Sequence, residues 1–143
     1  MSLDPAREAE VRASFAGQGL MRRLGVSLDA VEAGRCVVSL PFSDDVAQQL
    51  GFFHGGVVGA LADVAGGYAA MSVMPRGTDV VTLEYKINFL RPGAGERLVA
   101  EGTVLRSGRS VTVVRADVFV EAAGTRRRCA ATMGSVMAAP GRG

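Results

Sequence analysis

The residues best suited to chemistry lie at the start of, and inside, one segment rich in glycine and alanine. His54-Gly55-Gly56 opens that segment, and Asp63 is the one charged residue between Gly55 and Met74. A helix N-terminus leaves backbone N–H groups unpaired and carries a partial positive charge. Glycines there let a substrate oxygen approach those groups, as in an oxyanion hole. A tight loop–helix junction uses the same glycines, so this motif alone leaves both interpretations open.

Asp63 is flanked by apolar residues on both sides, from Leu61 to Ala65. Carboxylates are rarely buried without a partner, so we interpret Asp63 as a candidate general base or nucleophile. An Asp that faces solvent or binds a nearby Thr is the structural alternative. His54 and Asp63 are nine positions apart. On a helix this separation puts the two residues about half a turn out of phase and ~13 Å apart along the axis. Two antiparallel copies can bring these groups together more easily than one helix, so joint action of Asp63 and Gly55 predicts an obligate dimer.

The common catalytic and metal-binding motifs are missing from the sequence. It contains neither G-x-S-x-G, nor a P-loop, nor a G-x-G-x-x-G that follows a strand. His54 is the single histidine, and Cys36 and Cys129 belong to no C-x-x-C, so a zinc set cannot be assembled. We therefore expect no zinc site, and we expect reduced, packed thiols.

The composition is that of an ordinary globular domain. The chain has 143 residues, of which 48% are hydrophobic and 21% charged, and its net charge is +2. These values favour one domain and argue against nucleic-acid or membrane partners. The segment from Gly55 to Met74 has the length of a membrane span, but its glycines and central Asp63 disfavour one. The first residues carry no apolar signal core, so we expect a cytoplasmic protein.

Hydrophobic periodicity and turn residues predict an α+β domain with one long buried helix. The helices are expected at Pro5 to Ala16, Leu20 to Leu24 and Gly55 to Val73, with a loop from Ser43 to Phe53. The strands are expected at Val26–Glu32, Arg35–Phe42, Val80–Leu90, Arg97–Leu105, Val111–Glu121 and Arg126–Met137. Short turns at regular spacing predict an antiparallel meander.

Three segments together resemble the hotdog-fold acyl-CoA thioesterases, most closely the phenylacetate-degradation (PaaI) type. They are Gln48-x5-His54-Gly55-Gly56-x6-Asp63, the strand from Val81 to Pro92, and Ser107-Gly108-Arg109-Ser110. The resemblance covers roughly residues 20–137. It implies a long central helix wrapped by a five- to six-stranded antiparallel sheet, in a single domain over 1–143 with residues 1–19 as a helical extension. It also implies hydrolysis of acyl-CoA without a cofactor, and dimers joined edge to edge that commonly pair into homotetramers.

The resemblance also implies roles for individual residues. Asp63 falls at the catalytic carboxylate, and Gly55, after His54, at the N–H that polarises the thioester carbonyl. Gln48 falls near the reacting centre, where Asn is more usual in this branch and Gln occurs in a neighbouring aryl-CoA branch, and Thr82 falls where a hydroxyl helps to place water. The residues that fall in CoA-binding segments are Gly56, Arg91, Pro92, Gly93, Arg106, Gly108, Arg109 and Ser110.

Two other functions remain open on the sequence alone. One is an acyl-thioester dehydratase or hydratase on the same fold, and the other is a non-catalytic sensor that binds acyl-CoA. Arg91, Arg106 and Arg109 could hold the phosphates of CoA or be ordinary surface charge. The sequence does not identify the acyl group.

Overall fold

The computed structural model describes residues 2–140. Within them the elements are α1 (Pro5–Ala16), α2 (Gly19–Leu24), β1 (Ser27–Glu32), β2 (Arg35–Pro41), the 3-10 turn η1 (Asp44–Val46), α3 (Gly55–Ser72), β3 (Thr78–Phe89), β4 (Arg97–Ser107), β5 (Val111–Ala122) and β6 (Thr125–Pro140). The predicted helices and strands are confirmed to within a few residues at each end. The expected loop before α3 contains the short turn η1.

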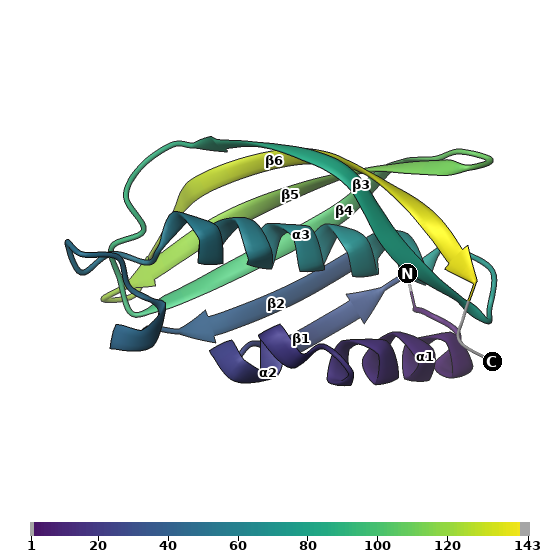
Figure 1. The fold of residues 1–143 in the computed structure, drawn as a ribbon, viewed down its shortest axis with the longest axis horizontal. Coiled ribbons are helices and arrows are strands. Elements are labelled where there is room, and N and C mark those ends of the chain that lie inside the picture. Colours follow the sequence, from purple (N-terminus) through teal and green to yellow (C-terminus); the bar gives the residue numbers. More distant parts are fainter. Residues whose placement is uncertain (1, 141–143) are drawn as a thin grey trace.

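One six-stranded antiparallel sheet curls around α3, in the order β1-β2-β4-β5-β6-β3 (Figure 1). This confirms the predicted α+β fold with a long central helix. The meander is confirmed for β4, β5 and β6. It is wrong for β3, which pairs with β6 instead of β4 and lies at the end of the sheet. One edge of β3 therefore pairs with no strand of the described chain.

Small residues allow the sheet to pass very close to α3. A Cβ on Gly102 of β4 would lie 2.2 Å from the carbonyl oxygen of Ala65, and one on Gly66 would lie 2.9 Å from Val114 of β5. Leu61, Ala65 and Ala69 are fully buried in this contact. The high glycine and alanine content of α3 is therefore a packing requirement, because larger side chains would force the sheet away from the helix.

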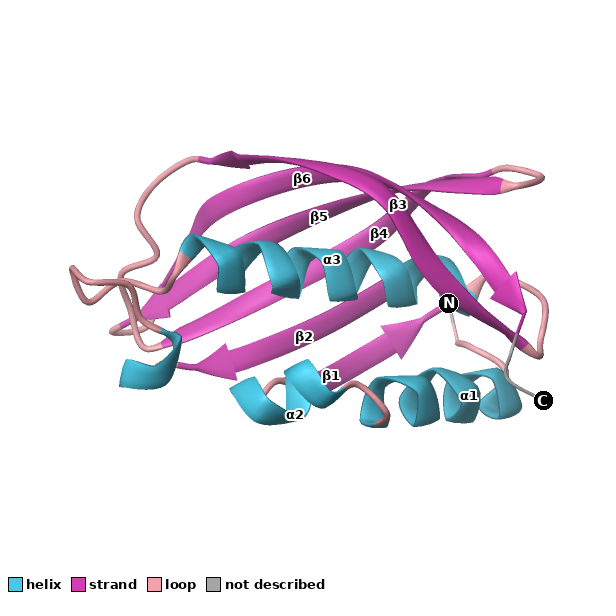
Figure 2. Cartoon of the chain, viewed as in Figure 1, coloured by secondary structure: helices cyan, strands magenta, loops and turns pink. Residues whose placement is uncertain are grey.

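Helices α1 and α2 lie beside β1 (Figure 2), and α1 packs against both α3 and β1. Asp4 caps α1 through the Ala6 N–H, as the Asp4-Pro5 pair predicts. Arg7 is buried, and its Nε and a terminal nitrogen donate to the Met71 carbonyl at 3.0 and 2.6 Å. This contact satisfies a carbonyl at the C-terminal end of α3 and attaches α1 firmly to the domain. Among residues 2–140, no helix is long and apolar enough to cross a membrane.

Candidate active site

Among residues 2–140, the start of α3 has one backbone N–H group without an acceptor. His54 is the N-cap, and its Nδ1 accepts the Gly56 N–H at 2.8 Å. The neutral imidazole therefore carries its proton on Nε2. The Val57 and Val58 N–H groups both donate to the His54 carbonyl. The Gly55 N–H is left with no acceptor among residues 2–140, so it is the group at this helix end that could bind an oxyanion.

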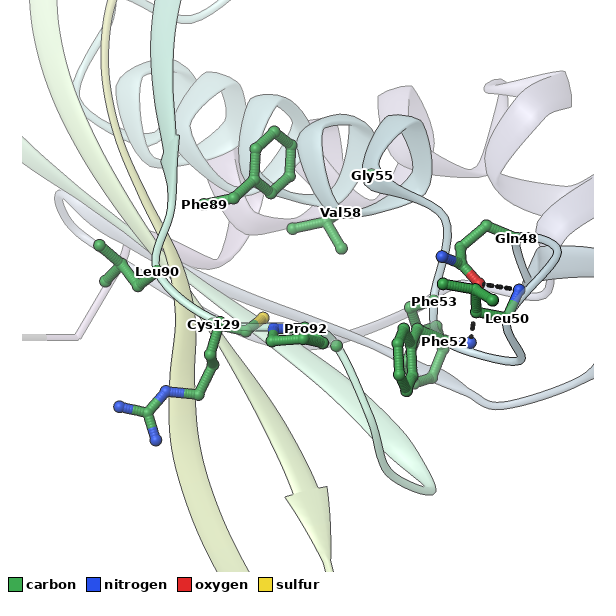
Figure 3. A pocket seen from close by; sticks show the side chains of 12 residues that line it. Gln48, Leu50, Phe52, Phe53, Gly55, Val58, Phe89, Leu90, Pro92 and Cys129 are labelled. Carbon is green, nitrogen blue, oxygen red and sulfur yellow. Dashed lines mark hydrogen bonds between the residues drawn. The ribbon is translucent and has the colours of Figure 1, made fainter.

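A cleft of about 500 Å³ opens beside Gly55 (Figure 3). We call it the N-terminal cleft; its lining includes Gln48, Gly55, Phe89, Arg91, Pro92, Gly93 and Cys129. The Phe89 ring lies 3.3 Å from where a Cβ on Gly55 would be, so a side chain at this position would push against the ring. Most of the lining is aromatic or aliphatic, which suits an uncharged part of a ligand.

Gln48 is held with its amide nitrogen toward the N-terminal cleft (Figure 3). Its Oε1 accepts the N–H groups of Leu50 and Phe52, the latter at 3.2 Å. The backbone of Gln48 also accepts from Gly51 and donates to Phe52. Because the oxygen is occupied by its own loop, the Nε2 group remains available as a donor in the cleft.

Asp63 lies halfway along α3 and is half-buried. Its Oδ1 accepts a hydrogen bond from Thr82 Oγ1 of β3 at 2.7 Å. A second cavity, of about 220 Å³, lies beside this pair. We call it the Asp63 groove; its lining is Gln18, Asp63, Val64, Gly67, Tyr68, Val80 and Thr82.

A bulge in β3 explains why Thr82 faces Asp63. Strict alternation would place Thr82 on the polar face with Glu84, opposite Tyr85. The pairing of β3 with β6 shifts by one residue between Thr82 and Glu84. As a result both Thr82 and Tyr85 turn toward α3, where the Tyr85 hydroxyl lies 3.1 Å from the Cβ position of Gly59.

The structure separates Gly55 from Asp63 within one chain. The N-terminal cleft contains Gly55, whereas the Asp63 groove contains Asp63. The two residues are eight positions apart on α3, which corresponds to ~12 Å along the axis. This agrees with the spacing argument from the sequence, because within one chain Gly55 and Asp63 border different cavities.

The predicted CoA-binding residues also fall into two groups. Arg91, Pro92 and Gly93 line the N-terminal cleft with Gly55 and Gln48, and Gly56 follows at the start of α3. The second group, Arg106, Gly108, Arg109 and Ser110, lies in and beside the hairpin between β4 and β5. That hairpin lies at the opposite end of the molecule from the start of α3 (Figure 1). Sequence reasoning did not single out Phe89 or Tyr68, which only the packing around α3 brings into these cavities.

The comparisons with known proteins agree with the fold. The model of the thioesterase superfamily matches residues 50–125. A protein of Saccharolobus solfataricus whose name assigns it provisionally to the esterases is 37% identical, over 80% of each chain. A 1,4-dihydroxy-2-naphthoyl-CoA hydrolase of Listeria monocytogenes is 30% identical, over 66% of this chain and 77% of the relative. This chain therefore belongs to the thioesterase superfamily.

Solved structures support the same assignment. A thioesterase family protein from Silicibacter pomeroyi superposes with a TM-score of 0.92 at 38% identity, over 94% of this chain and 99% of that one. The PaaI protein of Escherichia coli, from the phenylacetic acid degradation operon, gives a TM-score of 0.86 at 26% identity, over 98% of each chain. A Bacillus halodurans protein in a crystal structure with CoA gives a TM-score of 0.76 at 25% identity, over 93% of this chain and 83% of that one. The predicted resemblance to the PaaI type is confirmed.

Proposed function

We propose that this chain hydrolyses acyl-CoA thioesters, in active sites that combine Gly55 of one copy with Asp63 of a second. The observation that carries the proposal is the separation of these residues by ~12 Å on one helix, in two different cavities. A twofold dimer with antiparallel α3 helices brings each Gly55 to the other copy's Asp63.

The free edge of β3 supports such a dimer. Leu83 and Tyr85 on this strand are 52% and 42% exposed, although both are large and apolar. An exposed strand edge pairs readily with a second chain. The midpoint between residues 55 and 63 is Gly59, which the Tyr85 hydroxyl approaches. The dimer axis therefore passes near Tyr85, with the two β3 strands paired across it.

The chemistry follows from the groups in these two halves. The Gly55 N–H binds the carbonyl oxygen and stabilises the negative charge that develops on it. Asp63 takes a proton from water, whose oxygen attacks the carbonyl carbon. The carbon–sulfur bond then breaks, and the proton passes to the leaving CoA thiolate, so the products are the free acid and CoA. Direct attack by Asp63 to form an anhydride is the other route, and single-turnover hydrolysis in heavy-oxygen water distinguishes the two.

Neighbouring side chains support these two groups. Thr82 donates to one carboxylate oxygen of Asp63 and leaves the other available to water. The Nε2 of Gln48 donates into the cleft beside the Gly55 N–H.

CoA is assigned to the N-terminal cleft and its surroundings. Arg91, Pro92 and Gly93 line the cleft. In an antiparallel dimer, the hairpin with Arg106 and Arg109 of the second copy approaches the same end, because it lies at the other end of its own chain. Guanidinium groups suit the phosphates of CoA. The name of the Listeria relative and the CoA in the Bacillus crystal structure support this ligand.

An assay of free-thiol release tests the function directly. We expect CoA to be released from at least one member of a panel of aryl- and alkyl-CoA esters, without added metal. Tight binding of acyl-CoA with no thiol release would instead identify a sensor. Hydration of an enoyl ester without thiol release would identify a hydratase.

A further inference from the structure

The Asp63 groove extends from the candidate carboxylate toward the C-terminal end of α3. Asp63 and Thr82 lie at one end of it, and Tyr68 lies five residues further along the helix, or ~7.5 Å along its axis. Val64 and Val80 form apolar sides between these ends. The groove therefore begins at the proposed reacting centre and leads away from the position of Gly55.

The N-terminal helices provide the far wall of this groove. Gln18 follows Gly17 between α1 and α2, and its side chain does not cap α2. Its Nε2 donates instead to the Tyr68 hydroxyl at 2.8 Å. The buried Arg7 holds α1 against the end of α3, so this wall is part of the folded domain.

A directed chain of hydrogen bonds fixes the wall. The Asp79 carboxylate accepts from Ser14 Oγ, which lies 3.0 Å from both of its oxygens. Ser14 therefore donates its hydroxyl hydrogen to Asp79, and it accepts a hydrogen bond from the Tyr68 hydroxyl at 3.0 Å. Tyr68 in turn accepts from Gln18. Burial raises the pKa of Tyr68 above its ordinary value, so the phenol keeps the proton that this chain requires.

Gln18 retains hydrogen-bonding capacity that this chain does not use. One N–H of its amide is bound to Tyr68, whereas its Oε1 and second N–H have no partner among residues 2–140. The side chain lines the groove and is only partly buried. The groove, whose sides between Asp63 and Gln18 include Val64, Gly67 and Val80, thus ends at an amide that can both donate and accept.

We propose that the Asp63 groove receives the acyl group and that Gln18 sets its length and polarity, selecting groups about one aromatic ring long that end in a hydrogen-bonding substituent. This inference rests on the proposed function. The size agrees, because an apolar cavity of roughly 150 Å³ holds benzene and this groove measures about 220 Å³. A substrate then lies across two chains, with its CoA arm in one N-terminal cleft and its acyl group in the other copy's groove.

Gln18→Leu tests the polarity claim, since leucine has a similar bulk and no hydrogen-bonding group. The substrates are two aromatic acyl-CoA esters that differ only in a para hydroxyl against a para methyl. We expect the full-length wild-type protein to prefer the hydroxyl ester in kcat/KM, and Gln18→Leu to reduce that preference by about 5- to 10-fold, the effect of one lost hydrogen bond. Gln49→Leu makes the same change at an exposed glutamine outside the groove and should leave the preference unchanged.

Gln18→Ala tests the length claim, because it opens the far end of the groove. With straight-chain acyl-CoA esters of increasing length, we expect the longest well-hydrolysed chain to become longer in this variant. Thiol release from no ester by the wild-type protein would overturn the proposed function itself. Thiol release with the same hydroxyl preference in Gln18→Leu and the same length limit in Gln18→Ala would overturn this inference and leave the thioesterase function standing.

Discussion

The start and the middle of α3 border two cavities with opposite character. The N-terminal cleft is large, mostly apolar, and offers backbone and amide N–H donors at Gly55 and Gln48. The Asp63 groove has less than half that volume and contains a carboxylate at one end and an amide at the other. The first can bind a carbonyl oxygen and a long ligand, and the second can supply a base. This difference is what the proposed function builds on, in which the two cavities are complementary halves of a site that a second copy joins.

The largest expected effect comes from the carboxylate of the Asp63 groove. Asp63→Asn keeps the shape and the hydrogen bond from Thr82 but cannot accept a proton from water. We expect kcat to fall by about 10³-fold, with little change in the affinity for acyl-CoA, because general-base catalysis contributes on this order. Steady-state thiol release and calorimetric binding measure the two quantities. Asp117→Asn, on the outer face of β5, serves as the matched control, and unchanged turnover in Asp63→Asn would refute the assigned role.

The next effect concerns the donor at the start of α3. Gly55→Pro removes the N–H, and proline is favoured at the first position of a helix. His54 has ψ of 136°, which is compatible with a following proline. We expect kcat to fall by about 10²- to 10³-fold, as for other lost oxyanion donors. Gly55→Ala, which keeps the N–H but presses on Phe89, separates the loss of the donor from steric disturbance. An equal loss in both variants would contradict the assignment.

A smaller effect is expected from the support of the carboxylate. Thr82→Val removes the hydroxyl that donates to Asp63 at almost constant volume. We expect kcat to fall by about 5- to 10-fold, which corresponds to one hydrogen bond, and Thr82→Ser to recover most of it. Thr103→Val, on β4 away from both cavities, is the control. If Thr82→Ser were as impaired as Thr82→Val, the hydroxyl would not be what matters.

The sequence predicted most of the fold because its signals are local. The Asp4-Pro5 helix start, the glycine turns and the small residues of α3 each act within a few positions. The neighbour of β3 was not predictable in this way, since the choice between β4 and β6 depends on how the whole sheet closes around α3. Hydrophobic alternation cannot place a non-local strand pair.

The candidate site was predicted in part. The residues were identified from their types, their spacing and the family resemblance, and the ~12 Å separation of Gly55 and Asp63 follows from helix geometry. The bulge beside Leu83 was not visible in the sequence. The alternation of apolar and polar residues continues across it without a break, and this pattern assigns Thr82 to the wrong face of the strand. The use of the Gly56 N–H by His54 was also hidden, as it depends on a side-chain rotamer.

The smallest expected effect concerns a thiol in the wall of the N-terminal cleft. Burial raises the pKa of Cys129 to about 11, so the folded protein keeps this proton at pH values where the unfolded chain loses it. The folded state then binds more protons than the unfolded state, and stability falls as pH rises from about 9 toward 11. Cys129→Ala should make the decrease in Tm over this range shallower. Parallel Tm curves for the two proteins would contradict the prediction.

Mixing two inactive variants tests the shared site most directly. A dimer with one Asp63→Asn chain and one Gly55→Pro chain contains one site with both Gly55 and Asp63 intact and one site with neither. After the two variants are mixed in equal amounts and allowed to exchange subunits, we predict a return to about a quarter of the wild-type thiol release, since half the dimers are mixed and half of their sites are intact. Subunit exchange confirmed by mass, with activity no higher than that of the separate variants, would contradict an active site shared between two chains.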